Sequence, residues 1–223
     1  MSEFNQKELL DLLNRNRPLW LFGVDLSSAD LRFAPLQGAV LTMSDLTGAN
    51  LWGANLSGAH VDGANLPGAT MTSAFLQGTI LAGSVLKGAT LAFADLTNAD
   101  LANADFTNTD TRSANLQGAV MKKAIFTGAN LTESNLNNAM LYQANLQKAQ
   151  LNVASLAGAN LQEADLSNAQ LLNANLEGAD LTNTNLTGAD LTGANLANVK
   201  GLGGPSITHK QLASVRELPL LAK

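Results

Sequence analysis

A strict five-residue period governs this chain from Leu26 to Leu196. The same position returns 35 times without an insertion or deletion, and Leu occupies it 29 times. Two residues before each of these positions stands a small residue, which is Ala in 28 of the 35 cases. Because every unit has the same pattern, each is expected to adopt the same backbone conformation as its neighbours. The pattern therefore predicts a repeat architecture in which successive units stack on one another.

The period of five is incompatible with a continuous helix or strand. Apolar residues at every fifth position advance by about 500° around an α-helix and form no stripe. In a long strand the odd period would send successive Leu side chains to opposite faces. What remains is a short extended piece followed by a corner, repeated so that each Leu and each small residue point inward. The chain is therefore expected to coil.

Individual units also carry a recognisable signature. The blocks Ala49-Asn50-Leu51-Trp52-Gly53 and Ala54-Asn55-Leu56-Ser57-Gly58 resemble the unit of the pentapeptide repeat proteins, and the resemblance covers about four fifths of the chain. It implies an all-β solenoid, namely a right-handed quadrilateral β-helix with four units in each coil. The repeat would then make about nine coils, and the rod would be roughly 42 Å tall at the usual inter-strand spacing.

The two ends of the stack are expected to be covered by helices, because an open coil exposes unpaired backbone groups and bare Leu side chains. The predicted division is an N-terminal helical cap over 1–20, the β-helix over 21–199, and a C-terminal linker and helical cap over 200–223. Near the start, Asn5 and Glu8 have the spacing of a capping box, so we expect a helix over about residues 6–14.

The C-terminal segment has the same type of helix signal. Thr208 and Gln211 form a second predicted capping box, and the helix is expected to span His209 to Glu217. This helix and the residues that follow it carry more apolar side chains than a short exposed helix usually has. These residues are Leu212, Val215, Leu218, Leu220 and Leu221. Two interpretations stay open. The segment is a lid on the last coil of a monomer, or it is a contact that joins two rods as a homodimer.

The residues that usually carry chemistry are scarce. The chain has no Cys, which excludes disulfides and thiolate metal sites. Its two His residues, His60 and His209, are separated by most of the repeat, so no nucleophile, base and orienting group converge. Many Gly residues fall at the last position of the unit, where a corner needs permissive dihedrals. We therefore expect no enzymatic activity, no cofactor and no metal.

The charge balance bears on partners and on location. Residues 24–199 contain 14 Asp and Glu against 6 Lys and Arg, a surface that would repel a phosphate backbone, so no direct nucleic-acid ligand is expected. The first seven residues lack a basic region followed by an apolar run, and no apolar run approaches the length of about 18 residues that spans a membrane. The expected location is cytoplasmic, without a membrane partner.

Candidate binding residues stand at the outward position just before each Leu, which is ordinarily Asp or Asn. An apolar residue at this exposed position departs from the repeat and is therefore a candidate for contact with a partner. If residues 20 apart are stacked, a coil with outward apolar residues is followed by one with outward Asp residues, and then by a second apolar coil. We call the following set the central girdle: Phe75, Ile80, Val85, Asp100, Asp105, Val120, Ile125 and Met140.

Two interpretations of the central girdle stay open. It is an interaction surface for a protein partner of unknown identity, or it is an ordinary part of the rod. In the second case Lys87, Lys122 and Arg112 would neutralise the nearby Asp105, Asp100 and Asp110, and β-branched residues would be present because they favour extended backbone.

Two details concern packing inside and at the edge of the rod. Thr111 is the one polar residue at the Leu position, so its hydroxyl is predicted to bond to a backbone carbonyl, while Phe106 supplies missing volume. At a corner of the coil, Phe33 and Phe93 are expected to pack over small residues such as Gly53.

The resulting functional hypothesis is a non-enzymatic scaffold or regulator that presents a rigid acidic rod to another protein. One alternative rests on the family resemblance, since members that protect DNA gyrase or topoisomerase IV are acidic rods similar to duplex DNA. This chain lacks the projecting loops of drug-protecting members. A second alternative is a purely structural element of a larger assembly. Residues 211–219 resemble tails common among cyanobacterial members, which makes relatives in cell differentiation or environmental response plausible analogues.

Overall fold

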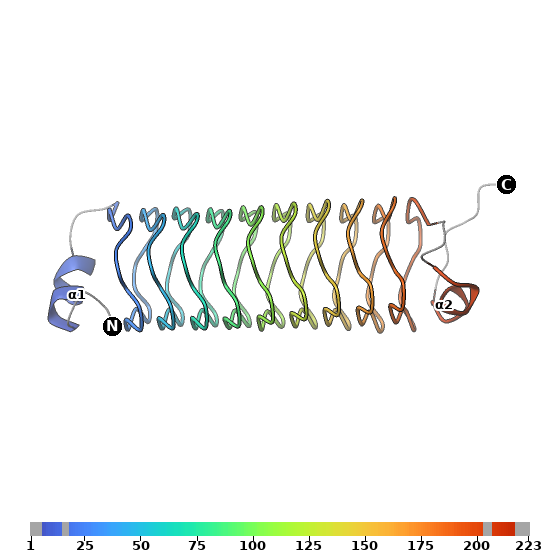
Figure 1. The fold of residues 1–223 in the computed structure, drawn as a ribbon, viewed down its shortest axis with the longest axis horizontal. Helices are drawn as coiled ribbons and strands as arrows, with labels where there is room; N and C mark the ends of the chain where they lie inside the picture. Colours follow the sequence, from blue (N-terminus) through green and yellow to red (C-terminus); the bar gives the residue numbers. More distant parts are fainter. Residues whose placement is uncertain (1–5, 15–17, 203–206, 217–223) are drawn as a thin grey trace.

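The computed structural model describes residues 6–14, 18–202 and 207–216. Parallel bridges join each bridging residue to the one 20 positions later, from Trp20 with Val40 to Asp180 with Lys200. Nine such steps lead from Trp20 to Lys200, so this part of the chain makes nine coils of four units each. Figure 1 shows the result, a straight rod with one helix at each end. The predicted coil length and coil number are confirmed, while the right hand of the coil stays a prediction.

Each unit contains one bridging residue, and backbone bonds from this residue and others of the unit join it to both neighbouring coils. Asn55 donates its backbone N–H to the carbonyl of Ala34 at 2.9 Å, and the next residue, Leu56, donates to the carbonyl of Phe75 at 2.8 Å. The chain then turns at once, so the described part of the rod contains isolated bridges instead of continuous strands. The extended piece that the period predicts is thus a single residue.

The last residue of each unit turns the chain and has a positive φ angle. Gly58 has a φ of 64° and Asn98 a φ of 56°, both in the left-handed region that Gly and Asn adopt most easily. This confirms the interpretation of the repeated Gly residues as turn residues.

The core consists of the inward Leu and Ala columns. Leu51 and Ala54 are fully buried, as are nearly all their equivalents along the rod. The rings of Phe106 and Phe126, one coil apart, stack with centroids 4.7 Å apart. Thr111 is fully buried, and its hydroxyl donates to the carbonyl oxygen of Asn130 at 2.9 Å, as predicted.

The N-terminal helix, α1, spans Gln6–Leu13 and lies beyond the first coil (Figure 1). Leu12 is 8% exposed and belongs to the buried core cluster, and Leu13 packs against that cluster. The helix therefore covers the open end of the stack with apolar side chains. The expected capping residue Asn5 lies outside the described residues.

The C-terminal helix, α2, spans His209–Ala213 at the opposite end of the rod. Its capping box is confirmed, because Gln211 N donates to Thr208 Oγ1 at 3.2 Å and Thr208 N donates to Gln211 Oε1 at 2.8 Å. The expected helix end at Glu217 is wrong.

The early end of α2 has a physical cause in the pairing of residues 214–216 with the last coil. The carbonyl of Ser214 accepts the N–H of Gly193 at 2.8 Å, and Arg216 donates its N–H to the carbonyl of Ala194 at 2.9 Å. These bonds satisfy backbone groups at the open end of the stack, which a longer helix would leave unpaired. Among the expected cap residues, Leu218, Leu220 and Leu221 lie outside the described part of the chain.

Candidate functional site

The outward Asp and Asn residues have a local structural task. In many units their Oδ1 atom accepts the backbone N–H two residues later, as Asn55 does from Ser57 and Asp105 does from Thr107, both at 3.0 Å. This side chain therefore stabilises the turn that follows it. An apolar residue at the same position gives up a hydrogen bond worth roughly 0.5–1.5 kcal/mol. Apolar outward residues are for that reason the informative exceptions.

The bridging residues form four columns along the rod, which we number from the N-terminus. Column 1 begins at Trp20, column 2 at Asp25, column 3 at Asp30 and column 4 at Pro35. The structure places most of the central girdle on two successive columns. Column 1 carries Ile80, Asp100, Val120 and Met140, column 2 carries Val85, Asp105 and Ile125, and column 4 carries Phe75.

Members of the central girdle differ in how much of them a partner would reach. Phe75 is 49% exposed and Met140 is 53% exposed, whereas the Ile and Val residues of the girdle are half-buried between the coils. A partner would therefore contact mainly the half-buried Ile and Val side chains. Phe75 and Met140 would protrude from this surface, Met140 at the C-terminal end of the girdle in column 1.

Basic side chains neutralise part of the acidic coil within the girdle. Lys87 Nζ lies 3.2 Å from Asp105 Oδ2. Arg112 donates from Nε and from an Nη atom to the two carboxylate oxygens of Asp110 at 2.8 and 2.7 Å. Both pairings agree with the prediction. Their exposed positions limit each to the small contribution usual for surface ion pairs, about 0–1 kcal/mol.

The expected pairing of Lys122 with Asp100 is wrong. Lys122 Nζ lies 5.7 Å from the ring centroid of Tyr142, one coil further along, in a cation–π contact. Asp100 instead accepts the N–H of Ala102 at 3.0 Å. Among the described residues Asp100 has no ion pair with a Lys or Arg, and neither has Asp95 in the same coil.

Hydrogen bonds keep the paired carboxylates charged. At Asp105 burial opposes the charged form most strongly, but hydrogen bonds from Thr107 and Lys87 outweigh it and lower the pKa. At Asp110 the hydrogen bond from Arg112 is the largest influence and also lowers the pKa. These groups are therefore ionised and locally bound near neutral pH.

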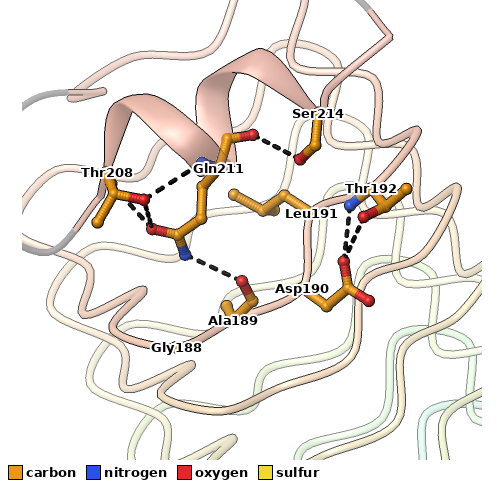
Figure 2. A pocket seen from close by; sticks show the side chains of 8 residues that line it. All are labelled: Gly188, Ala189, Asp190, Leu191, Thr192, Thr208, Gln211 and Ser214. Atoms are coloured by element: carbon orange, nitrogen blue, oxygen red, sulfur yellow. Dashed lines mark hydrogen bonds between the residues drawn. The ribbon is translucent and has the colours of Figure 1, made fainter.

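The second candidate region is the seam between α2 and the last coil, which Figure 2 shows. Gln211 Nε2 donates to the carbonyls of Leu186 and Ala189 at 3.0 and 2.9 Å. In the coil below, the equivalent of Ala189 is Ala169, whose carbonyl accepts the backbone N–H of Asp190 at 2.9 Å. The Gln211 amide thus takes the place of a backbone donor that the next coil would have supplied.

Apolar contacts complete this seam. The structure packs Leu212 and Val215 against the core cluster. The depression beside them is lined by Gly188, Asp190, Thr192 and neighbouring residues. In Figure 2 the Asp190 carboxylate is engaged by Thr192 and the Gln211 amide by Ala189, so the polar groups of this depression already have partners.

Exposed apolar residues form a row at the corner between columns 3 and 4, of which the sequence analysis identified the corner pair Phe33 and Phe93 but not the continuation to Val153 and Leu172. Half of the ten large exposed hydrophobic residues in the described chain lie there, and they are Phe33, Trp52, Phe93, Val153 and Leu172. The signal that identifies them is the same register from coil to coil, applied to the turn positions instead of the bridging positions.

One of these corner residues has the expected packing. The ring of Phe33 covers Gly53, where an added Cβ would lie 2.8 Å from a ring carbon. The same ring meets Trp52 edge to face, with centroids 4.7 Å apart. The corresponding prediction for Phe93 stays a prediction.

No group of three or more His, Asp or Glu side chains is placed to hold a metal ion within 6–14, 18–202 and 207–216. In those same ranges the helices are too short and too polar to cross a membrane.

The sequence profile described as pentapeptide repeats matches this chain in eight copies, over 44–83, 84–122, 112–147, 138–171 and 159–198. These matches cover well over half of the chain, and the coil geometry agrees with them. The chain belongs to the pentapeptide repeat family. A comparison with curated proteins finds no match.

Several solved structures are similar to this chain. HetL, a pentapeptide repeat protein involved in heterocyst differentiation regulation in the cyanobacterium Nostoc, is 29% identical over 89% of this chain and 91% of its own, with a TM-score of 0.46. QnrB1, a plasmid-mediated fluoroquinolone resistance protein, is 22% identical over 90% and 89%, with a TM-score of 0.31. Rfr23 from the cyanobacterium Cyanothece is 36% identical over 45% and 63%, with a TM-score of 0.20.

Proposed function

We propose that this protein is a non-enzymatic cytoplasmic scaffold that presents the central girdle to a protein partner. The proposal takes the rod to be the right-handed quadrilateral β-helix that family membership implies. The observation that supports it is the cluster of apolar residues on columns 1 and 2, above all Ile80, Val120 and Met140 in one column. Each of them replaces the Asp or Asn that would stabilise its turn.

The charges of the girdle define the chemistry of the partner surface. Asp100 lies between Ile80 and Val120 in column 1 and has no Lys or Arg ion pair among the described residues. A complementary partner would present apolar side chains on both sides of one basic group. Charge complementarity of this type sets orientation and partner choice more than affinity.

The rod also suits this role mechanically. Each coil is bonded to the coils before and after it along all four columns, and its core is filled by Leu and Ala. A surface held in this way loses little conformational entropy when a partner binds. In this proposal the stacked coils provide a rigid support, and the central girdle determines which protein binds.

The test is affinity capture of the tagged protein from a lysate of its source organism, followed by mass spectrometry. The Ile80→Asp, Ile125→Asp double variant should fold, because Asp already occupies both columns at Asp100 and Asp105. A matched control, Asn160→Asp with Asn185→Asp, adds the same charge to the same columns outside the girdle. We expect one protein that is retained by wild type and control and lost by the girdle variant.

Other outcomes of the affinity capture would indicate a different function. Recovery of gyrase or topoisomerase IV subunits, followed by inhibition of supercoiling in the purified system, would establish DNA mimicry instead. The ion pairs of Asp105 and Asp110 weigh against that outcome, since they reduce the free negative charge of the rod. A partner retained equally by both variants would remove the girdle as its binding surface, and no specific partner would favour a structural role.

A further inference from the structure

Three pairs of residues repeat along the corner between columns 3 and 4. In each pair a turn residue donates its backbone N–H to the carbonyl of a residue 19 positions later, so the two lie on adjacent coils. The pairs are Phe33 with Trp52 at 2.9 Å, Phe93 with Arg112 at 3.0 Å, and Val153 with Leu172 at 2.8 Å. Successive pairs are three coils apart. We call these six residues the corner ridge.

The apolar members of the ridge are costly where they stand. Phe33, Phe93 and Val153 have φ angles of 56°, 60° and 60°, at a position that Gly or Asn occupies in most units. Left-handed backbone costs an ordinary residue about 1–2 kcal/mol, and a β-branched residue is a particular outlier there. Val153 is nevertheless 56% exposed and Phe93 is 65% exposed, so burial within the chain does not offset this cost.

The two outer pairs lie at equal distances from the central pair. An aromatic pair lies three coils before the Phe93 and Arg112 pair, and an aliphatic pair lies three coils after it. A two-fold axis through the central pair would place the aromatic pair of one copy on the aliphatic pair of a second copy. The same axis would place each Phe93 ring against Arg112 of the other copy.

We propose that a second copy of this chain packs antiparallel along the corner ridge. The resulting interface is isologous, as in most homodimers. Its ends are apolar contacts between the Phe33 and Trp52 pair and the Val153 and Leu172 pair. Its centre consists of two symmetric cation–π contacts, worth about 0.5–2 kcal/mol each depending on desolvation.

Charge disfavours the parallel arrangement, in which every ridge residue would face its own copy, and it does so chiefly through Glu133, because Arg32 and Arg112 are paired with Asp30 and Asp110. Arg32, Arg112 and Glu133 all lie at this corner. In a parallel dimer each of them would meet a like charge, which is unfavourable. In the antiparallel dimer Glu133 faces Thr72 and Ser73 of the second copy, whose hydroxyls are hydrogen-bond donors to a carboxylate.

The first test measures association by sedimentation velocity from micromolar to millimolar concentration. Phe93→Asn and Val153→Asn should each weaken dimerisation by about tenfold or more, the usual effect of removing an interface anchor. Both variants should fold, because Asn98 adopts the same backbone conformation with a φ of 56°. Met43→Asn is the matched control, since Met43 is also an exposed apolar residue at positive φ but lies at the corner between columns 1 and 2.

The second test determines the orientation by disulfide crosslinking, which is simple in a chain without Cys. The variants Ser73→Cys and Glu133→Cys should crosslink when mixed, and neither should crosslink with itself. Self-crosslinking of the separate variants would overturn the antiparallel arrangement. A wild type that stays monomeric over the whole range, or a dimer that Phe93→Asn and Val153→Asn leave intact, would overturn the proposal itself. These results are independent of the girdle, whose main residues stand on columns 1 and 2.

Discussion

Replacing Thr111 with Leu should stabilise the rod by about 1 kcal/mol. The side chain is fully buried and lies between Leu91 and Leu131, one coil before and one coil after it. Leu adds about two buried carbon groups, worth roughly 0.8 kcal/mol each. The hydroxyl bond to Asn130 O is lost, which costs about 1 kcal/mol, but removing the polar group also removes its desolvation cost. Asn130 O still accepts the N–H of residue 111, at 2.8 Å in the present structure, so no acceptor is orphaned.

The assay is thermal and denaturant unfolding of wild type, Thr111→Leu and Thr111→Val. A gain of about 1 kcal/mol corresponds to roughly 2–4 °C in Tm for a chain of this size. The Val variant has nearly the shape of Thr and lacks the hydroxyl, so it separates the lost bond from the added volume. A Leu variant that melts at or below wild type, beside an unchanged Val variant, would show that the neighbouring Phe106 already fills the space. That result would refute the reasoning.

Three further predictions follow from single contacts. Gln211→Ala should lower Tm and speed amide exchange in the last coil, because the Ala189 carbonyl loses the donor that replaces a missing coil and the Leu186 carbonyl keeps only the N–H of Ala189; exchange equal to wild type would contradict this. Gly53→Ala should destabilise the rod more than Gly58→Ala in urea titrations, because both have positive φ but only at Gly53 would the new Cβ meet the Phe33 ring. Since the pKa of Asp105 is lowered in the folded state, its contribution to stability is complete above the ordinary Asp pKa and is lost as pH falls through the folded value. Asp105→Asn should therefore flatten the acid limb of a plot of Tm against pH, and an unaltered limb would count against this.

The features that follow from the backbone could be predicted from the sequence. The odd period of the repeat excludes a long strand. The coil of four units, which the family resemblance implies, then places Ile80 beside Asp100 and Asp100 beside Val120. The bond made by Thr111 was also predictable, because a buried hydroxyl in an apolar column has few partners besides a carbonyl.

The features that depend on competition between neighbours were not predictable. Lys122 has both Asp100 and Tyr142 one coil away, and nothing in the repeat decides which of them a long flexible side chain meets. Local propensity favours a helix as far as Glu217, but pairing of Ser214 and Arg216 with the last coil ends it earlier. Phe33 and Phe93 were interpreted from the sequence as local packing at a corner, so the continuation of the row to Val153 and Leu172 was not recognised.

Each position of the repeat has a structural role that favours certain residue types, so a surface residue can be compared with the type usual at its position. Asp or Asn stabilises the turn at the bridging position, and Gly or Asn suits the left-handed turn position. Ile80 departs from the first rule and Val153 from the second, and each departure costs roughly a kcal/mol in the isolated rod. Departures that cluster in register along the rod, at two separate surfaces, are best explained by contacts that the isolated chain does not make. The girdle and the corner ridge therefore require separate tests, one for a different protein and one for a second copy.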